Sequence, residues 1–342
     1  MTRLSLRFDL RVPPFASTSF AAQHQAMLEM ATWGDRVGVD TLTLSEHHGD
    51  PAGFTSAPIT LAAAVLARTR RLKVSIAAAL VPLHDPVRLA EQLASVDCLA
   101  PGRLTVVLGA GYRRVEFAMA GIERRERGAL LEECVAVLRS SWSGKPFTWR
   151  GRELLVTPPP ATPQGPEILV GGKTVAAARR AARLRCKFSP AVGNPEVIGA
   201  YFHECERVGF GGADVYGCAS LAAYREQYPP GRPLAPGFVM PSADPDRTWQ
   251  RIRRHVEYDA TTYAAWQEDG VVSDWAVPGA STWEQLRDSG RYAVVTPAQC
   301  LALAARDAQL TLHPLMGGIE PELAWESLRL FEALVLPQLG RG

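Results

Sequence analysis

Residues 74–111 read VSIAAALVPLHDPVRLAEQLASVDCLAPGRLTVVLGAG, and this stretch decides the fold class. It begins inside an almost wholly apolar segment, Leu72–Leu80, whose length and composition predict a buried strand. Asp85 and Pro86 then suit the cap and the first turn of a helix, which a proline and a glycine end. A second apolar strand, Arg103–Leu108, follows directly. Apolar strands joined by a helix predict parallel strands that are covered on both faces.

The same alternation of strands and helices runs along the rest of the chain. Further strands are predicted at Leu4–Leu10, Thr41–Ser45, Glu167–Val170, Lys187–Pro190, Gly237–Met240 and Leu310–Leu315. Helical periodicity predicts helices at Gln23–Val37, Ile59–Ala67, Arg127–Trp142 and Pro321–Leu336. Such an alternation fits either an open doubly wound sheet or an eight-stranded barrel.

The positions of polar and glycine-rich residues distinguish these two folds. They follow several different strands, at residues 46–48, 82–85, 109–113, 171–174 and 314–318. A barrel assembles its active site from the carboxyl ends of many strands, whereas an open sheet concentrates it at one switch point. We therefore predict an α/β fold, a TIM (β/α)8 barrel, that forms a single domain over residues 1–342.

The C-terminal half contains a less regular stretch, and we predict an aromatic-rich insertion at about 211–295. Between about residues 190 and 295 lie seven of the eight tyrosines and four of the eight tryptophans, at positions 249, 266, 275 and 283. This concentration of aromatic residues indicates a lid or a subunit contact, or simply an insertion packed against the barrel. The sequence leaves these alternatives open.

Composition excludes several classes of protein. The 342 residues carry 37 Lys plus Arg against 35 Asp plus Glu, a net charge of +2. This near balance does not indicate binding to nucleic acid or to an acidic membrane surface. No apolar run approaches the roughly 18 residues that span a bilayer, and the N-terminus lacks the apolar core of a signal peptide. Six scattered cysteines without a Cys-x-x-Cys spacing indicate a reducing compartment. We expect a cytoplasmic protein.

The strand at Thr41–Ser45 ends in Glu46-His47-His48. These side chains either satisfy one another as structural polar groups or deliver acid–base chemistry to the rim of the barrel. Because side chains alternate along a strand, only one of the two imidazoles can face the barrel mouth. The same alternation keeps the two from sharing a cation easily, and His313 stands alone on its strand, so we predict no metal site.

Two glycine-rich turns follow other strands. Gly109-Ala110-Gly111 has the first two glycines of a dinucleotide motif, but Arg114 occupies the position of the third, which indicates an ordinary tight turn. Gly171-Gly172-Lys173-Thr174 opens a helix directly after a strand, where backbone N–H groups and Lys173 suit a phosphate. The alternative for this segment is also an ordinary turn, because the Walker spacing is absent.

Several of these segments together resemble the bacterial-luciferase-like family of flavin-dependent monooxygenases, which also contains deazaflavin (F420) dependent oxidoreductases. The resemblance runs nearly end to end. It rests on LSEHHGD, on residues 74–111, on PEILVGGKTVAAARRAARL and on LTLHPLMGGIEPELAWESLRLFEALVLPQL. It implies a TIM-type barrel with reduced flavin across its C-terminal mouth.

The resemblance also implies roles for individual residues. His47 matches the family's catalytic histidine near the reactive edge of the flavin, and His48 looks like its structural neighbour. Ala77-Ala78 matches the position of a non-prolyl cis peptide under the flavin ring, and Gly171 to Thr174 match the segment that holds the flavin phosphate. The cofactor-binding residues expected on this basis are Ala77, Ala78, Gly109, Gly111, Gly171, Gly172, Lys173 and Thr174.

The function implied is that of a two-component monooxygenase using reduced FMN, supplied by a flavin reductase, and O2 on a small organic substrate. The alternatives are an F420-dependent hydride-transfer enzyme and a flavin-binding protein without turnover. Where luciferases carry a phosphate-binding arginine after the fourth strand, this chain has Ala110, and Lys173, Arg113 and Arg114 are candidates to replace its charge. The family resemblance also implies a homodimer.

Overall fold

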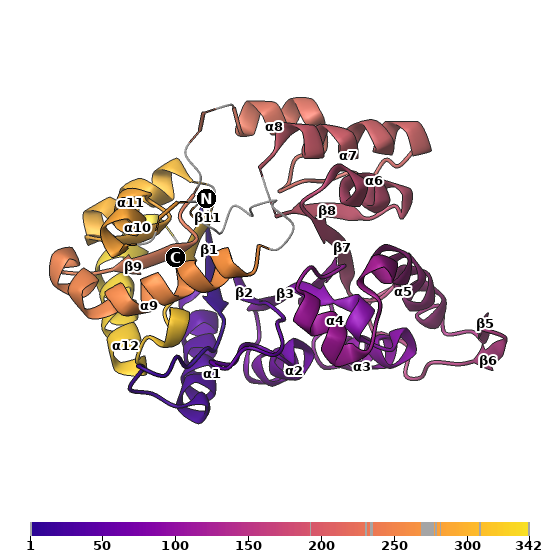
Figure 1. The fold of residues 1–342 in the computed structure, drawn as a ribbon, viewed down its shortest axis with the longest axis horizontal. Helices are drawn as coiled ribbons and strands as arrows, with labels where there is room; N and C mark the ends of the chain where they lie inside the picture. Colours follow the sequence, from indigo (N-terminus) through magenta and orange to yellow (C-terminus); the bar gives the residue numbers. More distant parts are fainter. Residues whose placement is uncertain are drawn as a thin grey trace.

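The computed structural model describes residues 2–191, 193–229, 231–232, 235–267, 277, 279–280, 282–307 and 309–340. Figure 1 shows a curved sheet with helices packed on its outer side. The strands of this sheet are β1 (Arg3–Phe8), β2 (Thr41–Leu44), β3 (Lys73–Leu80), β4 (Leu104–Gly109), β7 (Glu167–Gly172), β8 (Lys187–Pro190), β9 (Phe238–Pro241), β10 (Tyr292–Val295) and β11 (Gln309–Leu312). A separate hairpin joins β5 (Phe147–Trp149) and β6 (Arg152–Leu154).

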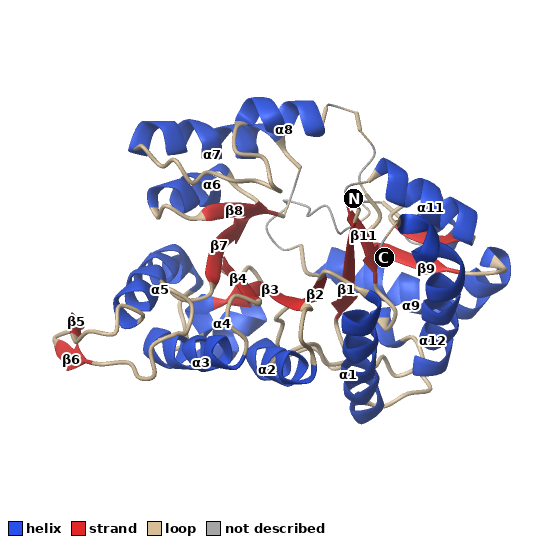
Figure 2. Cartoon of the chain, turned by 180° about the vertical axis from the view of Figure 1, so that it is seen from behind, coloured by secondary structure: helices blue, strands red, loops and turns tan. Residues whose placement is uncertain are grey.

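Helices connect nearly all of these strands. They are α1 (Phe20–Val37), α2 (Pro58–Arg68), α3 (Pro86–Leu99), α4 (Arg114–Ala120), α5 (Arg127–Ser141), α6 (Val175–Arg183), α7 (Pro195–Val208), α8 (Leu221–Gln227), α9 (Pro245–Ala265), α10 (Trp283–Asp288), α11 (Pro297–Arg306) and α12 (Pro321–Leu330). In Figure 2, α1, α2 and α3 lie side by side along one outer side of the sheet. No helix in the described part of the chain is both long and apolar enough to cross a membrane.

The strands follow the order of a barrel from β11 onward, whereas β9 lies between β10 and β11. The sheet runs β10-β9-β11-β1-β2-β3-β4-β7-β8, and every pairing within it is parallel. The last strand, β11, lies beside the first, and the order then advances along the sequence without the reversal of a doubly wound sheet. No described residue pairs β8 with β10, so the ring of strands is open between these two. The predicted α/β class is confirmed, and the order from β11 through β1 to β8 is that of a TIM barrel.

The local signals of the sequence explain the helix ends. Gly38 adopts the left-handed conformation, with φ 84°, and ends α1 as its C-cap. Asp85 caps α3 by accepting hydrogen bonds from the backbone N–H groups of Val87 and Arg88, and Pro86 occupies the first turn. The predicted final helix is α-helical only to Leu330, because the chain then continues as a π-helical turn and a 3-10 turn.

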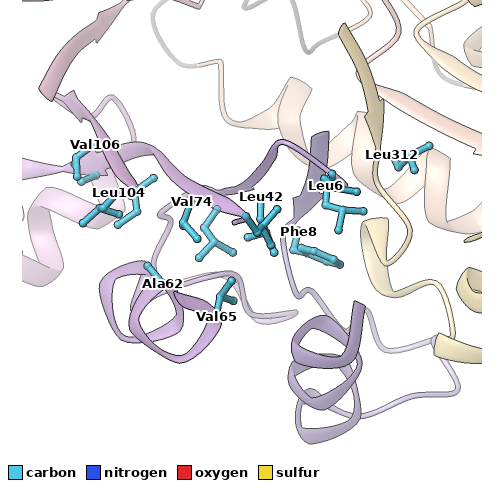
Figure 3. Close-up of a cluster of buried hydrophobic side chains, with 14 of the residues drawn as sticks. Leu6, Phe8, Leu42, Ala62, Val65, Val74, Leu104, Val106 and Leu312 are labelled. Atoms are coloured by element: carbon cyan, nitrogen blue, oxygen red, sulfur yellow. The ribbon is translucent and has the colours of Figure 1, made fainter. Parts of the chain in front are cut away.

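Alternation along the strands divides the sheet into two faces (Figure 3). Even-numbered side chains of β1 to β4 pack with side chains of α2 on the outer face. Those at 1% exposure or less include Leu6, Phe8, Leu42, Val74, Leu104 and Val106 from the strands, and Ala62 and Val65 from α2. Burial of each large apolar side chain of this kind contributes about 1.5–3 kcal/mol. The odd-numbered side chains therefore face the interior of the ring, and in register they include Arg7, Thr43 and Ser75.

The stretch 211–295 contains regular structure. β9 and β10 join the main sheet, and α9 is a helix of 21 residues, while Trp275 lies outside the described residues. Whether this stretch is best treated as an insertion in one domain stays a prediction. Its aromatic side chains near the end of α9 pack on residues that follow the first, second and fourth strands, as the next section describes.

Candidate active site

His47 lies at the carboxyl end of β2 and points toward the inside of the ring of strands. Its side chain is buried, and its Nδ1 lies 2.9 Å from Oε1 of Glu116 in α4. Aromatic rings surround it: the centroids of Phe54 and Trp266 are each 4.8 Å from that of the imidazole, and that of Tyr112 is 5.8 Å away. Phe54 follows β2, Tyr112 follows β4 and Trp266 ends α9, so three parts of the chain enclose one imidazole.

The carboxylate of Glu116 determines which nitrogen of His47 carries the proton. Oε1 of Glu116 also accepts from the backbone N–H of His48, at 3.1 Å, and from Nη1 of Arg113, at 3.1 Å. An oxygen on which these donors converge acts as an acceptor, so Nδ1 of His47 carries the hydrogen and Nε2 presents its lone pair. The other oxygen, Oε2, is buried and has no hydrogen-bond partner among the described residues. This fits a site that a bound donor completes.

Burial lowers the pKa of His47 below its ordinary value, and the nearby charges of Arg113 and Arg11 lower it further, against the opposing effect of Glu116. The imidazole is therefore neutral at neutral pH. A neutral ring with a free Nε2 can accept a proton or a hydrogen bond from a bound molecule.

His48 and Glu46 belong to a different network, as alternation along the strand predicts. Oε1 of Glu46 accepts from Nε2 of His48, at 3.0 Å, and from Nε2 of His84, at 2.8 Å, while Oε2 accepts from the backbone N–H of Leu80. Burial alone would raise the pKa of Glu46, but these hydrogen bonds lower it to about 2. His48 thus satisfies a structural carboxylate, whereas the side chain of His47 has a separate partner, Glu116.

Small residues on β3 and β4 lie against each other beside this mouth. The peptide bond between Ala77 and Ala78 is cis, as the family resemblance implies, and the register with β4 shifts between Ala77 and Ala79. A Cβ at Gly109 would come within 2.9 Å of the Cβ of Ala78, so only glycine allows this approach. On the next strand, a Cβ at Gly171 would come within 2.9 Å of Cγ1 of Val107.

The segment predicted to hold a phosphate begins α6. Thr174 caps this helix by accepting a hydrogen bond from the backbone N–H of Ala177 at 3.2 Å. Nζ of Lys173 lies 5.2 Å from the ring of Tyr112 and donates to Oε1 of Gln267 at 3.3 Å. A helix N-terminus beside a lysine fits an anionic group such as a phosphate. The chain therefore has the parts for a flat cofactor with a phosphate: small residues on adjacent strands and a cationic helix start.

Arg113 is engaged elsewhere and is a poor replacement for the arginine that luciferases carry. Its guanidinium donates to the backbone carbonyl of His48 at 2.7 Å and lies 3.9 Å from the ring centroid of Trp266. Such a stacked, buried cation holds the end of α9 on the mouth. Lys173 remains the candidate that lies at the predicted phosphate segment.

Sequence reasoning missed three members of this site: Glu116, Trp266 and Phe54. A signal for Glu116 was present, because it lies in the first turn of a helix that begins just after the glycine turn at residues 109–111. Trp266 belongs to the aromatic-rich stretch that suggested a lid, but no local pattern pairs it or Phe54 with His47, since these contacts depend on how distant segments pack. Within the described residues, no group of three or more His, Cys, Asp or Glu side chains could hold a metal ion.

Comparison with proteins of known sequence shows partial matches to curated enzymes. The chain is 38% identical over 144 residues to the FMNH(2)-dependent dimethylsulfone monooxygenase of Pseudomonas fluorescens (strain Pf0-1), which is 40% of this chain and 39% of the relative. It is 31% identical over 137 residues to the F420-dependent glucose-6-phosphate dehydrogenase 2 of Rhodococcus jostii (strain RHA1), which is 36% of this chain and 40% of the relative. The matches thus span less than half the length of these relatives.

Solved structures match over nearly the whole chain. The monooxygenase RslO1 from Streptomyces bottropensis has a TM-score of 0.72 at 22% identity, with 99% of this chain and 100% of that chain covered. The oxygenating constituent of 3,6-diketocamphane monooxygenase from Pseudomonas putida, solved in complex with FMN, has a TM-score of 0.69 at 18% identity, with 99% and 98% covered. At these identities the likeness establishes the fold.

The family model described as luciferase-like monooxygenase matches residues 10–289. This range contains His47 and Glu116, the cis peptide bond at Ala77-Ala78 and the start of α6. Because the match extends over most of the chain, the protein belongs to the luciferase-like monooxygenase family.

Proposed function

We propose that the protein is the oxygenating component of a two-component monooxygenase, which binds reduced FMN from a separate flavin reductase and uses O2 to oxygenate a small organic substrate. The observation that carries this proposal is His47: a buried, neutral imidazole at the carboxyl end of β2, held through Nδ1 by Glu116 and surrounded by the rings of Phe54, Tyr112 and Trp266. The FMN-dependent relative and the FMN-bound structural neighbour support the choice of cofactor.

The chain's own residues divide the work in this proposal. Ala77, Ala78 and Gly109 leave room for a flat ring, while Lys173 and the start of α6 hold the phosphate. Bound reduced flavin supplies the two electrons that activate O2. His47 accepts a proton at Nε2, and Glu116 holds the imidazole in the tautomer that leaves this nitrogen free.

The aromatic residues around His47 have a separate role. Phe54, Tyr112 and Trp266 form a wall of rings around the imidazole. A wall of this kind excludes water from the reacting atoms, which protects reactive oxygen species from unproductive loss.

A second candidate function is F420-dependent hydride transfer without O2 chemistry. Ala110 favours it, because the arginine that luciferases place on the flavin phosphate is missing there. The match to an F420-dependent dehydrogenase also supports it. That the protein is a homodimer and that it is cytoplasmic are also predictions.

Cofactor binding followed by oxidation separates these functions. The purified protein is titrated with FMN, FAD and F420, and each reduced complex is then mixed with aerated buffer while its absorbance is followed. We expect the tightest binding with FMN and oxidation kinetics of the bound flavin that differ from those of free reduced FMN. Tight binding of F420 alone, with no O2 consumption, would establish the second function instead. Binding of FMN without turnover of any substrate would indicate a flavin-binding protein.

A further inference from the structure

Arg113 contacts three segments of the chain that meet around His47. It is the N-cap residue of α4 and is 5% exposed. Its Nη1 donates to the backbone carbonyl of His48, after β2, at 2.7 Å, and to Oε1 of Glu116, in the first turn of α4, at 3.1 Å. Its guanidinium lies 3.9 Å from the ring centroid of Trp266, at the end of α9. These contacts fix the position of a buried positive charge beside the imidazole.

Arg113 and His47 share one carboxylate oxygen. Oε1 of Glu116 lies 2.9 Å from Nδ1 of His47 and 3.1 Å from Nη1 of Arg113. Because both nitrogens contact the same oxygen, they lie within about 6 Å of each other, the range over which a like charge disfavours protonation. The guanidinium therefore opposes a second positive charge on the imidazole.

The charges of this group balance when His47 is neutral. The carboxylate of Glu116, 1% exposed, offsets the guanidinium of Arg113. A proton on the imidazole would add a buried positive charge without a further counter-ion, which is costly. Without Arg113, the same carboxylate would be left to His47 alone, and a pair of imidazolium and carboxylate would be the balanced state. The presence of Arg113 thus decides which form of His47 is favoured.

The other charges near His47 leave this balance in place. Arg11, after β1, also acts on the imidazole, but its own charge is offset by ion pairs with Asp9 and Asp259. Burial is the largest cause of the lowered pKa of His47, Glu116 opposes it, and Arg113 lowers the pKa more strongly than Arg11 does. Arg113 is therefore the cation with the larger influence on this imidazole.

The aromatic neighbours supply no counter-ion either. The rings packed against the imidazole belong to three residues: Phe54, Tyr112 and Trp266. Only the phenol of Tyr112 among them can ionise, and a phenol carries no charge near neutral pH. Nζ of Lys173, 5.2 Å from the ring of Tyr112, is a cation and so opposes protonation of His47 as well. Glu116 is accordingly the carboxylate on which the charge of His47 depends.

We propose that Arg113 is a positioning residue that holds His47 in its neutral Nδ1–H form by neutralising Glu116, and so keeps Nε2 able to accept a proton from a bound substrate. The consequence for turnover rests on the proposed function. The control of the charge on His47 belongs to the chain itself and is measurable without a cofactor.

A purely structural role for Arg113 predicts a different result. If the guanidinium only held α4 and α9 together, its loss would change the stability of the fold and the packing of Trp266. The protonation of His47 would then stay as it is in the wild type. Titration of this one imidazole therefore distinguishes the two roles.

Nuclear magnetic resonance of isotope-labelled histidine measures that titration in the cofactor-free protein, with His47→Gln used to assign the signals. Arg113→Gln should raise the pKa of His47 by about one unit or more. Arg113→Lys keeps the charge and should bring the pKa back toward the wild-type value. Arg88→Gln, which breaks a solvent-exposed pair with Glu91 at the same spacing on α3, is the matched control and should leave it unchanged. An unchanged or lower pKa in Arg113→Gln, or an equal rise in Arg113→Lys, would overturn the proposal.

A double variant serves if Arg113→Gln alone fails to fold. Arg113→Gln combined with Glu116→Gln removes both buried charges together, so neither is left unpaired. The pKa of His47 in this double variant should lie above that in Glu116→Gln, because only the single variant retains the guanidinium. Equal pKa values in these two variants would also overturn the proposal.

The pH dependence of kcat/KM gives a second readout and separates this proposal from the proposed function. Its acidic limb should move to higher pH in Arg113→Gln. If the pKa of His47 responds to Arg113 but reduced FMN neither binds nor reacts with O2, the control of His47 stands and the monooxygenase function falls. If reduced FMN binds and reacts but the pKa of His47 does not respond, the monooxygenase function stands and the role of Arg113 falls.

Discussion

His47 and His48 are adjacent in the sequence, yet the protein treats them in opposite ways. His47 is buried against Glu116, and burial lowers its pKa. His48 is about a quarter exposed at its side chain, and its hydrogen bond to Glu46 raises its pKa. The one-residue step along a strand that ends at the barrel mouth places the two imidazoles on opposite sides. Both side chains have a carboxylate partner, so the difference in their burial and pKa follows from the side of the strand on which each lies.

The two carboxylates differ in the same way. Glu46 accepts from two imidazoles and a backbone N–H group, so both of its oxygens are used. The hydrogen bonds of Glu116 converge on Oε1, and its buried Oε2 has no partner among the described residues. A fully satisfied network stabilises the fold, whereas a partly satisfied one indicates a place that a ligand completes.

The largest expected effect comes from removing the imidazole that faces the mouth. His47→Ala should lower kcat about 10²–10⁴-fold, the usual contribution of a positioned acid–base group, with FMN affinity changed little. Single-turnover oxidation and product formation are measured, with His24→Ala on the exposed side of α1 as the matched control. Unchanged turnover in His47→Ala would remove this residue from the mechanism.

Glu46→Gln should affect stability and leave the chemistry largely intact. Its folded-state pKa of about 2 lies below the ordinary 4.5, so the ionised form is favoured on folding. Linkage then gives about 3 kcal/mol of stability at pH 7, present above about pH 4.5 and lost as the pH falls toward 2. Urea unfolding at pH 7 and at pH 3 checks this, with a smaller wild-type advantage expected at pH 3. An advantage that grows at low pH would contradict the assignment.

Much of this fold could be predicted because its signals are local. Apolar runs such as Leu72–Leu80, the Asp85 cap and the stop at Gly38 each act within a few residues, and the structure confirms them. Side-chain alternation also predicted that one imidazole would face the mouth.

The partners of these side chains could not be predicted in the same way. Glu116 is 69 residues from His47 in sequence, and Trp266 reaches the site only because α9 packs across the strand ends. The cluster of Asp9, Arg11 and Asp259 spans 250 residues and depends on the same packing. Such contacts follow from the curvature of the sheet and the packing of α9 on it, which no short pattern encodes.

Glu116→Gln sharpens the comparison by keeping the shape and removing the charge. The amide no longer enforces the Nδ1–H tautomer of His47, so kcat should fall roughly tenfold. Glu116 raises the pKa of His47, so its loss should lower that pKa further, and the acidic limb of the pH profile should move to lower pH. The dependence of kcat/KM on pH is the measurement. A limb that moves to higher pH would show that Glu116 does not act through His47.

The smallest effect on activity is expected at His48. The direction in which its effect on stability changes with pH completes the comparison with Glu46. His48→Gln removes one of the two imidazole donors to Glu46, which should cost about 0.5–1.5 kcal/mol and leave kcat unchanged. Because the folded-state pKa of His48 is raised, its contribution is fully present below about pH 6.5 and is lost as the pH rises through the folded-state value. The stability difference between wild type and His48→Gln should therefore shrink between pH 6 and pH 9 in urea titrations. For Glu46→Gln the difference shrinks in acid instead, so opposite pH dependences from two hydrogen-bonded partners would identify one shared network. If His48→Gln lowered kcat as much as His47→Ala, the division of roles between the two sides of the strand would be wrong.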